Sequence, residues 1–524
     1  MAERAPAGET IAGMGASADS ATVSELQQAM ASGALTSAVL TEFYLARIEQ
    51  LNPLLRAVIR VSAGAAGEAA ASDQMRGDGA PRGPLEGIPV LVKDNIAARG
   101  MPATAGSPAL LEAESGDAFL VTRLRAAGAV IIGKANMSEW ANFRSTHSSS
   151  GWSTLGGQVA NPHALDRSPS GSSSGSGVAV AAALAPLAVG TETDGSIVCP
   201  ASACGIVGLK PTLGLVSRTG IVPISSEQDT AGPMARTVAD AAALLSVLAG
   251  ADPADPATGA AARRLGDYTA FLDSGALAGA RLGVWRAGCT GADRRTTAVL
   301  DAALAQLRDQ GAEVLDPVEL PGVDDISEHE FAALLHEFKR DLNAYLAALP
   351  GDHPATLAEL IAFNSRNGPE VLRYFGQELF ERAEATSGDP ADPAALAARE
   401  AATRLARAAL DGPLDAHHLD AVISLTANPA CLTDYVLGDH DVFHTSAPAA
   451  VAGYPAVSVP CGYVAGLPVG LSFLGPAWSE PKLIGLAHAF EQTVRPGRPP
   501  ALRASAVPDG VAGHSDAAFA AADK

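Results

Sequence analysis

The chain has 524 residues, of which 48% are hydrophobic and 18% are charged. Its 36 Lys and Arg against 57 Asp and Glu leave a formal net charge of −21. The hydrophobic fraction excludes general disorder, and the negative charge, which no local basic patch interrupts, disfavours phosphate backbones and anionic membranes as partners. We therefore predict neither a nucleic-acid nor a membrane partner.

The compartment is predicted from cysteine usage and from the N-terminal segment. The 5 cysteines are odd in number, widely spaced and form no CxxC pair, which favours a reducing environment. The first twenty residues have no basic and apolar regions typical of a signal peptide, and no apolar run of about 18 residues occurs. We expect a soluble, cytoplasmic protein.

Two terminal segments and one domain are predicted. Residues 1–20 and 501–524 are small and polar, and we expect both to be flexible. Residues 21–500 are expected to form a single domain. It begins with apolar residues at three- and four-residue intervals over 22–48, which predicts two amphipathic helices.

Strand-like and helical stretches alternate between residues 57 and 210, and strand signals resume after residue 420. The alternation predicts an α/β fold. Runs such as VLV and VII, which lack polar alternation, predict strands buried on both faces. Residues 250–418 are rich in Ala, Asp, Glu and Arg and are interpreted as a mostly helical covering inserted into one sheet.

The most informative segment is PSGSSSGSGVAVAAALAPLAVGTETDGS, residues 169–196. A Gly/Ser loop alone could be a flexible linker. Here the pattern predicts a helix over about 176–184 and a returning strand over 187–190, each about 15 Å long. Two serine-bearing turns would then lie at the same end of the sheet. Gly195 would permit a tight turn whose N–H groups converge on one anion.

A nucleophilic serine needs a base, and the usual histidine is missing from this neighbourhood. None of the 11 histidines lies between residues 164 and 328. Lys93 ends a buried-looking strand in GIPVLVKDN, where desolvation would lower its pKa as a neutral base requires. An ion pair with Asp94 is the structural alternative for Lys93, and Lys134 and Lys210 are rival bases.

These segments resemble the amidase signature family. The matching stretches are GPLEGIPVLVKDNI, AAGAVIIGKANMSEW, SPSGSSSGSGVAVAAALAPLAVGTETDGSIVCPAS, GIVGLKPTLGLVSRTGIVPISSEQDTAGPMARTVADAAALL and GYPAVSVPCGYVAGLPVGLSFLG. They occur in the family's order over residues 22–495. The resemblance implies a central mixed, twisted β-sheet covered by helices on both faces.

The resemblance also implies a Ser–cis-Ser–Lys triad. By it, Ser196 is the nucleophile, Ser172 is the bridging serine after a cis peptide bond, and Lys93 is the base. The backbone N–H groups of Thr193, Asp194, Gly195 and Ser196 would form the oxyanion hole, and no metal or organic cofactor is implied.

Two residues depart from the family pattern, because Ser174 and Asp194 stand where the family commonly has glycine. Asp194 would still supply its N–H group, so catalysis is not excluded. The combination of GTETDGSIVCP with NPHALDRSPSGSSSGSG is most similar to the peptide amidase branch, which removes ammonia from C-terminal peptide amides.

Four further residues are candidates for substrate contact. Trp140, Asn142 and Phe143 could line the acyl pocket, although core packing would explain them equally well. Gln228, next to Asp229, could either hold the catalytic loops or touch substrate.

Three local patterns are weaker alternatives. GSSSG at 171–175 matches a nucleophile elbow centred on Ser173, but no hydrophobic strand precedes it. GAVIIGK at 128–134 imitates a P-loop, but its interior is an apolar strand. His440 and His444 with Asp439 and Asp441 could hold a metal, but loop capping or contact with the substrate rim is preferred.

The predicted function is hydrolysis of linear carboxamides, such as C-terminal peptide amides, through an acyl-enzyme. The partner would be a small-molecule or peptide amide, and the protein would be a monomer or homodimer. One alternative within the fold is hydrolysis of anilides, esters or carbamates. A second is a role as the amidase subunit of a glutamine-dependent tRNA amidotransferase, which the TETDGS turn disfavours. A third is a non-catalytic binding module.

Overall fold

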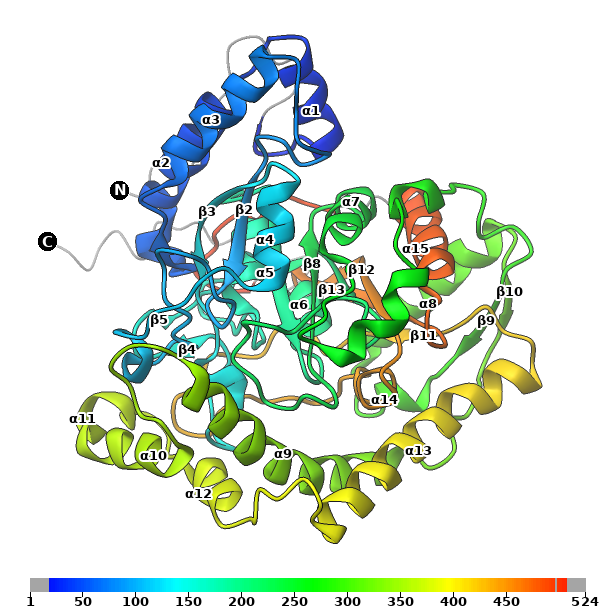
Figure 1. Cartoon of the computed structure of the whole chain (residues 1–524). Helices are drawn as coiled ribbons and strands as arrows, with labels where there is room; N and C mark the ends of the chain where they lie inside the picture. Colours follow the sequence, from blue (N-terminus) through cyan, green and yellow to red (C-terminus); the bar gives the residue numbers. More distant parts are fainter. Residues whose placement is uncertain (1–17, 495–496, 507–524) are drawn as a thin grey trace, which may run out of the picture.

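The computed structural model describes residues 18–494 and 497–506. Its central feature is a mixed sheet of 11 strands in the order β1-β3-β2-β6-β8-β7-β12-β13-β11-β9-β10 (Figure 1). β4 (Trp152–Ser153) and β5 (Gly157–Gln158) form a separate small sheet. The strands of the large sheet are β1 Val58–Val61, β2 Pro89–Lys93, β3 Val130–Ala135, β6 Leu187–Glu192, β7 Val207–Lys210, β8 Thr230–Ala235, β9 Arg281–Val284, β10 Glu313–Leu315, β11 Ala421–Leu425, β12 Ala456–Val464 and β13 Leu467–Leu474.

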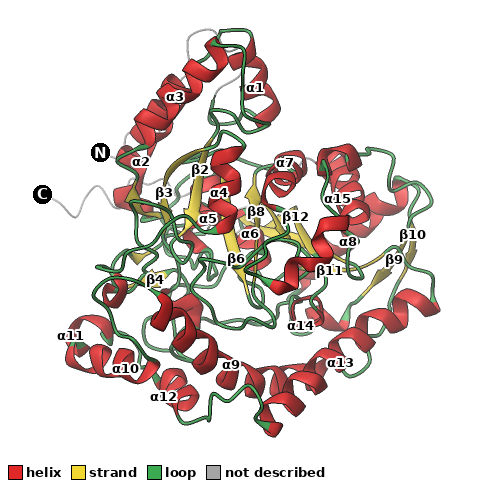
Figure 2. Ribbon diagram, in the orientation of Figure 1, coloured by secondary structure: helices red, strands yellow, loops and turns green. Residues whose placement is uncertain are grey.

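Helices cover both faces of this sheet (Figure 2). α5 and α6 pack on the middle strands from one side, and α4, α7, α8 and α15 form a second group along the other. The helices are α1 Val23–Ala31, α2 Ser37–Leu55, α3 Ala65–Gly77, α4 Phe119–Ala126, α5 Ser174–Ala181, α6 Val198–Cys204, α7 Val238–Leu248, α8 Arg294–Asp309, α9 Ile326–Ala348, α10 Leu357–Arg366, α11 Gly368–Val371, α12 Glu378–Glu384, α13 Pro393–Ala416, α14 Ala447–Ala452 and α15 Glu480–Val494. The predicted fold class is confirmed.

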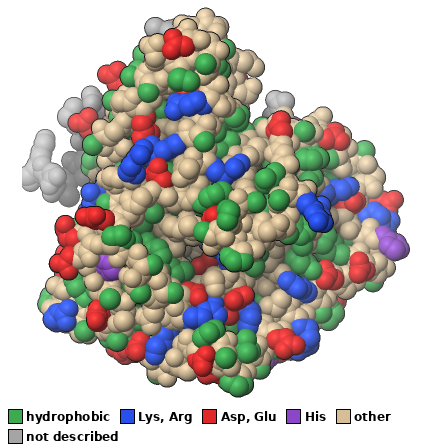
Figure 3. Space-filling view, in the orientation of Figure 1, with side chains coloured by type: hydrophobic (Ala, Val, Ile, Leu, Met, Phe, Trp, Pro, Cys, Tyr) green, Lys and Arg blue, Asp and Glu red, His purple; other side chains and the backbone are tan. Residues whose placement is uncertain are grey.

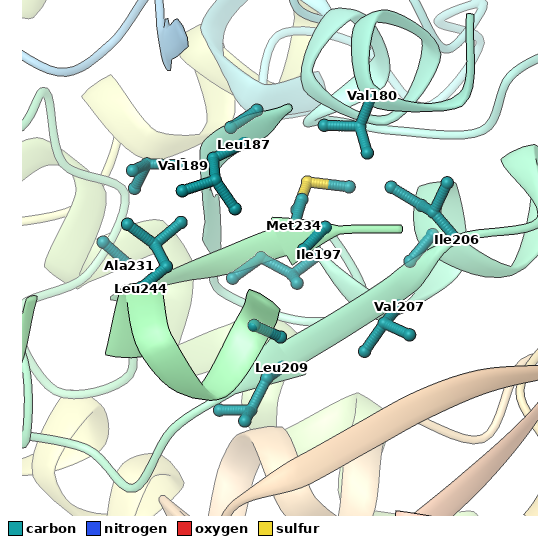
Figure 4. Packing of buried hydrophobic residues seen from close by; sticks show 14 of the residues in the cluster. Val180, Leu187, Val189, Ile197, Ile206, Val207, Leu209, Ala231, Met234 and Leu244 are labelled. Carbon is teal, nitrogen blue, oxygen red and sulfur yellow. The ribbon is translucent and has the colours of Figure 1, made fainter. Parts of the chain in front are cut away.

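The middle of the sheet is apolar on both faces. Figure 4 shows side chains of β6, β7 and β8 packed together with residues of α5 and α7, among them Val189, Leu209 and Met234, which are all fully buried. Burial on both faces explains why these strands lack polar alternation in the sequence.

Two parallel neighbours, β2 and β6, place the serine and lysine segments together. Val90 pairs with Leu187 and Val92 with Val189. Parallel neighbours end at the same edge of a sheet, so the lysine that ends β2 lies beside the last residues of β6. The strand predicted over 187–190 extends to Glu192, and the helix predicted over 176–184 spans Ser174–Ala181.

The region 250–418 consists mostly of helices but also contains two short strands. β9 and β10 lie within it, pair in parallel with each other, and extend the edge of the large sheet through the pairing of β9 with β11. These strands are only four and three residues long, so their apolar pattern is too short to stand out among Ala-rich helices. α9, α10, α12 and α13 form the expected covering along one side of the molecule (Figure 1).

A few residues of the two predicted terminal segments are described, and these contact the rest of the domain. Ala18 is fully buried and its carbonyl accepts a hydrogen bond from Tyr44 Oη at 2.9 Å. Near the other end, Leu165 N donates to Arg503 O at 2.8 Å. These contacts attach residues that a small, polar composition marked as flexible, while residues 1–17 and 507–524 lie outside the described part.

The surface and the thiols are consistent with the sequence analysis. On the face drawn in Figure 3, Lys and Arg side chains are scattered among acidic ones and form no continuous patch. The 5 cysteines are free thiols. Among the described residues, no helix is both long enough and apolar enough to cross a membrane.

Candidate active site

Lys93, at the end of β2, is fully buried. Its Nζ donates to three acceptors: Ser172 Oγ at 2.8 Å, Thr191 Oγ1 at 2.9 Å and Thr191 O at 3.0 Å. The three N–H bonds of an ammonium group are therefore all used. When Lys93 is neutral, two N–H bonds can remain on Thr191 while the lone pair faces the hydroxyl of Ser172.

Burial lowers the pKa of Lys93 from the usual 10.5 to about 7, although the nearby carboxylates of Asp229 and Glu192 raise it in part. Desolvation has this effect because it penalises the charged form of an amine. A large fraction of Lys93 is therefore neutral near physiological pH and can accept a proton.

Ser172 connects Lys93 to Ser196. Ser172 Oγ lies 3.0 Å from Ser196 Oγ, so a continuous hydrogen-bonded chain runs from the amine through two hydroxyls. The Gly171–Ser172 peptide bond is cis. A hydrogen bond from Ser173 N to Ser196 O at 3.1 Å holds the two serine turns against each other.

The turn that carries Ser196 is shaped by Gly195 and Glu192. Gly195 has φ +76, and a Cβ atom there would lie 2.9 Å from Cys199 Sγ and 3.0 Å from Ser446 Oγ, so only glycine fits. The Glu192 carboxylate accepts from Ile197 N at 2.7 Å and from Val198 N at 3.0 Å. These contacts fix both ends of the turn.

The turn presents a row of unused backbone donors. Within the described residues, the N–H groups of residues 193–196 donate to no protein acceptor. Consecutive free N–H groups beside a hydroxyl can receive an anion that develops on a bound carbonyl. Asp194 and Ser174 are not among the residues with positive φ, so neither replacement of glycine strains the backbone.

The rival lysines have other partners. Lys134 Nζ donates to Ile96 O at 2.6 Å and lies 3.6 Å from Asp94 Oδ1, which places Asp94 in an ion pair with Lys134 rather than with Lys93. Lys210 Nζ donates to Pro211 O at 3.2 Å. Among the described residues, three lysines are fully buried, and of these Lys93 alone is hydrogen-bonded to a serine of the two turns.

Gln228 is buried and binds a backbone carbonyl of the turn. It is 2% exposed, and its Nε2 donates to Thr193 O at 2.8 Å. Asp229 accepts from Thr193 Oγ1 at 2.5 Å, and burial raises the pKa of Asp229 to about 6. Of the two roles predicted for Gln228, these contacts favour holding the loop.

Trp140, Asn142 and Phe143 have mostly internal partners. The ring of Trp140 lies edge-on to Phe380 at 5.8 Å, and that of Phe143 lies 4.9 Å from Phe338 of α9. Asn142 Nδ2 donates to Ser150 Oγ at 2.9 Å, while its buried Oδ1 has no protein partner. Ring packing places both aromatic side chains in the core, while the buried Trp140 Nε1 and Asn142 Oδ1 are each left without a protein partner.

The segment 438–444 does not form a metal site. No group of three or more His, Cys, Asp or Glu side chains suited to a metal occurs among the described residues. Instead Asp439 accepts from Ser150 N at 3.0 Å, and His444 Nδ1 lies 3.0 Å from Ser446 Oγ. The capping alternative fits these contacts.

Sequence reasoning did not identify several residues that contact the site. Thr191 holds Lys93, and it could have been suspected because β6 runs parallel to β2. Ser446 lies against Gly195, and Glu330 and Arg399 bind Gln228. For these three residues, which are far from the motifs, the sequence carries no signal.

Comparison with known proteins agrees with this geometry. The family model described as Amidase matches residues 39–484. The chain belongs to the amidase signature family. It is an enzyme that hydrolyses amides, and its large mixed sheet with covering helices is the fold of that family.

Individual relatives are similar along most of their length. A peptide amidase in complex with the competitive inhibitor chymostatin is 52% identical, with a TM-score of 0.89 over 92% of this chain and 99% of that one. The native peptide amidase of Stenotrophomonas maltophilia is 51% identical, with a TM-score of 0.87 over 92% and 98%. A probable amidase of Arabidopsis thaliana is 41% identical over 92% of this chain and 91% of its own.

Members with another role are more distant. A glutamyl-tRNA(Gln) amidotransferase subunit of Roseiflexus sp. is 37% identical over 90% of this chain and 96% of its own. The relatives therefore include proteins named as amidases and proteins named as amidotransferase subunits.

Proposed function

We propose that this amidase hydrolyses C-terminal peptide amides or similar linear carboxamides through an acyl-enzyme on Ser196. The observation that carries the proposal is the chain from Lys93 through Ser172 to Ser196, with separations of 2.8 and 3.0 Å, beside a row of free N–H groups. The peptide amidases at 51% and 52% identity support the substrate class.

In the first step, Ser196 Oγ attacks the carbonyl carbon of the substrate. Its proton passes to Ser172 Oγ while the proton of Ser172 passes to neutral Lys93. The carbonyl oxygen becomes an oxyanion, which the N–H groups of residues 193–196 stabilise. The loss of one such donor typically costs about 10²–10³ in rate.

The intermediate then collapses. Protonated Lys93 returns its proton through Ser172 to the substrate nitrogen, the C–N bond breaks, and ammonia leaves. Water attacks the resulting ester of Ser196 by the same relay, and the carboxylic acid departs with Ser196 restored. No step requires a metal or an organic cofactor.

Two alternatives are less well supported. Anilides, esters and carbamates would use the same nucleophile and oxyanion site, so a substrate comparison must separate them. A role within an amidotransferase is disfavoured by the lower identity to proteins of that kind and by the net charge of −21, which opposes tRNA.

The test is a hydrolysis panel of peptide amides, fatty amides, anilides, esters and carbamates with the wild type and Ser196→Ala. We expect peptide amides to have the highest kcat/KM and Ser196→Ala to abolish turnover. Ser176→Ala is the matched control, because Ser176 is also buried in this motif but donates to Val189 O. Unchanged turnover in Ser196→Ala would overturn the mechanism.

A fluorophosphonate label provides an independent assignment of the nucleophile. Peptide mapping should find the label on Ser196. A label on Ser173, the alternative elbow serine, would overturn the assignment.

A further inference from the structure

Gln228 is held by hydrogen bonds at both ends of its side chain. Its Oε1 accepts from Arg399 Nη1 at 2.8 Å, and its Nε2 donates to Thr193 O at 2.8 Å and to Glu330 Oε1 at 2.6 Å. Because a guanidinium group only donates, the amide oxygen must face Arg399 and the NH₂ group must face Thr193. The orientation of this amide is thus determined by its partners.

The contact with Thr193 acts on the next residue. The carbonyl of Thr193 and the N–H of Asp194 belong to one planar peptide unit, and this bond is not among the cis bonds of the chain. In a trans peptide the two groups point in opposite directions. A donor that holds the carbonyl from behind therefore aims the N–H of Asp194 forward, into the row beside Ser196, and polarises it.

The side chain of Thr193 is anchored separately. Thr193 Oγ1 donates to Asp229 Oδ1 at 2.5 Å, and Asp229 Oδ2 accepts from Ile224 N at 2.8 Å and from Ser225 N at 3.0 Å. The residue is therefore fixed on the segment 224–229 even without Gln228. Removing Gln228 would free the peptide plane without releasing the turn.

Arg399, which orients Gln228, belongs to the helical covering. It lies on α13 and forms a forked ion pair with Glu337 of α9, at 2.7 Å from Nε and 2.6 Å from Nη2. The side chains are 14% and 5% exposed, and a buried fork of this kind is strongly directional. Glu337 also accepts from Ser225 Oγ at 2.6 Å.

We propose that Gln228, oriented by Arg399 and Glu337 of the helical covering, is a positioning residue that aims the Asp194 N–H group at the oxyanion. The inference rests on the proposed function, because it assumes that an oxyanion forms at residues 193–196. It gives the covering helices a part in catalysis: two segments far from the catalytic motifs in sequence set the direction of one oxyanion donor.

Gln228→Met tests the inference, because methionine has a similar length and lacks the donor. A misaimed donor loses part of the stabilisation that its deletion would remove, so kcat should fall about 10- to 100-fold. KM should change less than about twofold, since the ground-state carbonyl needs the donor less than the oxyanion does.

Gln377→Met is the matched control. Gln377 is another buried glutamine of the covering; its Oε1 accepts from Asn364 Nδ2 at 3.0 Å and its Nε2 donates to Ser365 Oγ at 3.1 Å. The hydrogen bonds of its side chain go to Asn364, Ile361 and Ser365, and none goes to the segment 224–229 or to the turn. It should lose stability to a similar extent while kcat stays within about twofold.

Inhibitor binding distinguishes a misdirected Asp194 N–H group from a general disturbance of the folded site. A peptide aldehyde adds to the serine and forms a tetrahedral adduct, whereas the matching peptide alcohol does not. In Gln228→Met the inhibition constant of the aldehyde should rise by the factor by which kcat/KM falls, and that of the alcohol should not change. Arg399→Lys, which keeps the charge but loses the fork, should show a smaller change of the same kind.

The outcomes separate this inference from the proposed function. If the wild type hydrolyses peptide amides and Gln228→Met keeps its kcat and its affinity for the aldehyde, the positioning role is wrong and the function stands. Equal weakening of aldehyde and alcohol binding would also refute it, because that pattern indicates a general disturbance of the site. A wild type that hydrolyses no amide would overturn both.

Discussion

The pH dependence of hydrolysis should report the protonation of Lys93. A lysine with the usual pKa of 10.5 would be neutral in only about 1 molecule in 3,000 at pH 7, whereas a pKa of about 7 makes about half of the molecules competent. Burial thus raises the fraction of neutral Lys93 at pH 7 by about three orders of magnitude. The shift corresponds to about 5 kcal/mol in favour of the neutral form.

The direction of this pH dependence follows from the role of Lys93 as a base. Lys93 must be neutral to accept a proton, so kcat/KM should rise with pH through about 7 and level off near pH 8 to 9. Asp229 lies near Lys93 and raises its pKa. Asp229→Asn should therefore move the rising limb to lower pH.

The assay is kcat/KM for one peptide amide from pH 5 to 10 at constant ionic strength. Lys93→Arg should lose about 10²–10⁴ in kcat/KM at every pH, because Arg cannot act as a base. Lys134→Arg is the control, because Lys134 is equally buried but is hydrogen-bonded to neither serine. The rise of kcat/KM with pH should therefore stay centred near pH 7, even if the protein is less stable. A flat profile, or a limb near pH 10, would refute the argument.

Three further changes and one treatment extend these tests. Gly195→Ala should lower kcat at least about 10²-fold in a steady-state assay. The φ of +76 disfavours alanine, and its Cβ would lie only 2.9 Å from Cys199 Sγ, so a methyl group does not fit beside the oxyanion donors. A near-normal kcat would show that the turn can adapt. Thr191→Val keeps the shape of the side chain but removes the Oγ1 atom that accepts a hydrogen bond from Lys93. We expect kcat to fall about tenfold and the pH profile to keep its form. An unchanged kcat would mean that Thr191 O alone holds the amine. Arg144→Met should lower the free energy of unfolding by about 3–5 kcal/mol, because it leaves the buried Glu139, which lies 2.6 Å from the guanidinium, without its partner. Thermal unfolding of Arg144→Met and of the double variant with Glu139→Gln measures this loss. Equal losses in the two variants would contradict the prediction. Dialysis against EDTA should leave kcat/KM unchanged, and a loss restored by added metal would contradict the cofactor-free mechanism.

Part of the proposed site follows from local patterns in the sequence. An apolar strand that ends in lysine makes Lys93 a candidate base, and a Gly/Ser turn followed by a helix and a returning strand predicts that two serine-bearing turns lie together. The individual roles of Ser172 and Ser196 are implied by the resemblance to the amidase signature family. The predicted fold class was reached from local patterns, since runs without polar alternation require a covered sheet. The exact ends of α5 and β6 were off by a few residues, because helix and strand ends depend on hydrogen bonds that composition does not encode.

Other features depend on contacts between distant segments. β9 and β10 are strands because an edge of the sheet is available to them. Ala18 is held by the side-chain hydroxyl of Tyr44, and Arg503 is held by the backbone of Leu165. Trp140 and Phe143 could be assigned to the core only once α9 and α12 were seen to pack on them.

The sequence by itself predicts the fold class, a candidate base at Lys93 and the meeting of two serine-bearing turns, because those depend on residues within short motifs and on two adjacent strands. Only the tertiary structure shows that Arg399 and Glu330 bind Gln228 and that Glu337 binds Ser225, in the segment 224–229 that holds the turn of Ser196. On an isolated helix such charges indicate a solvated face, and their ion pairs and hydrogen bonds exist only where α9 and α13 pack against each other and against the segment 224–229.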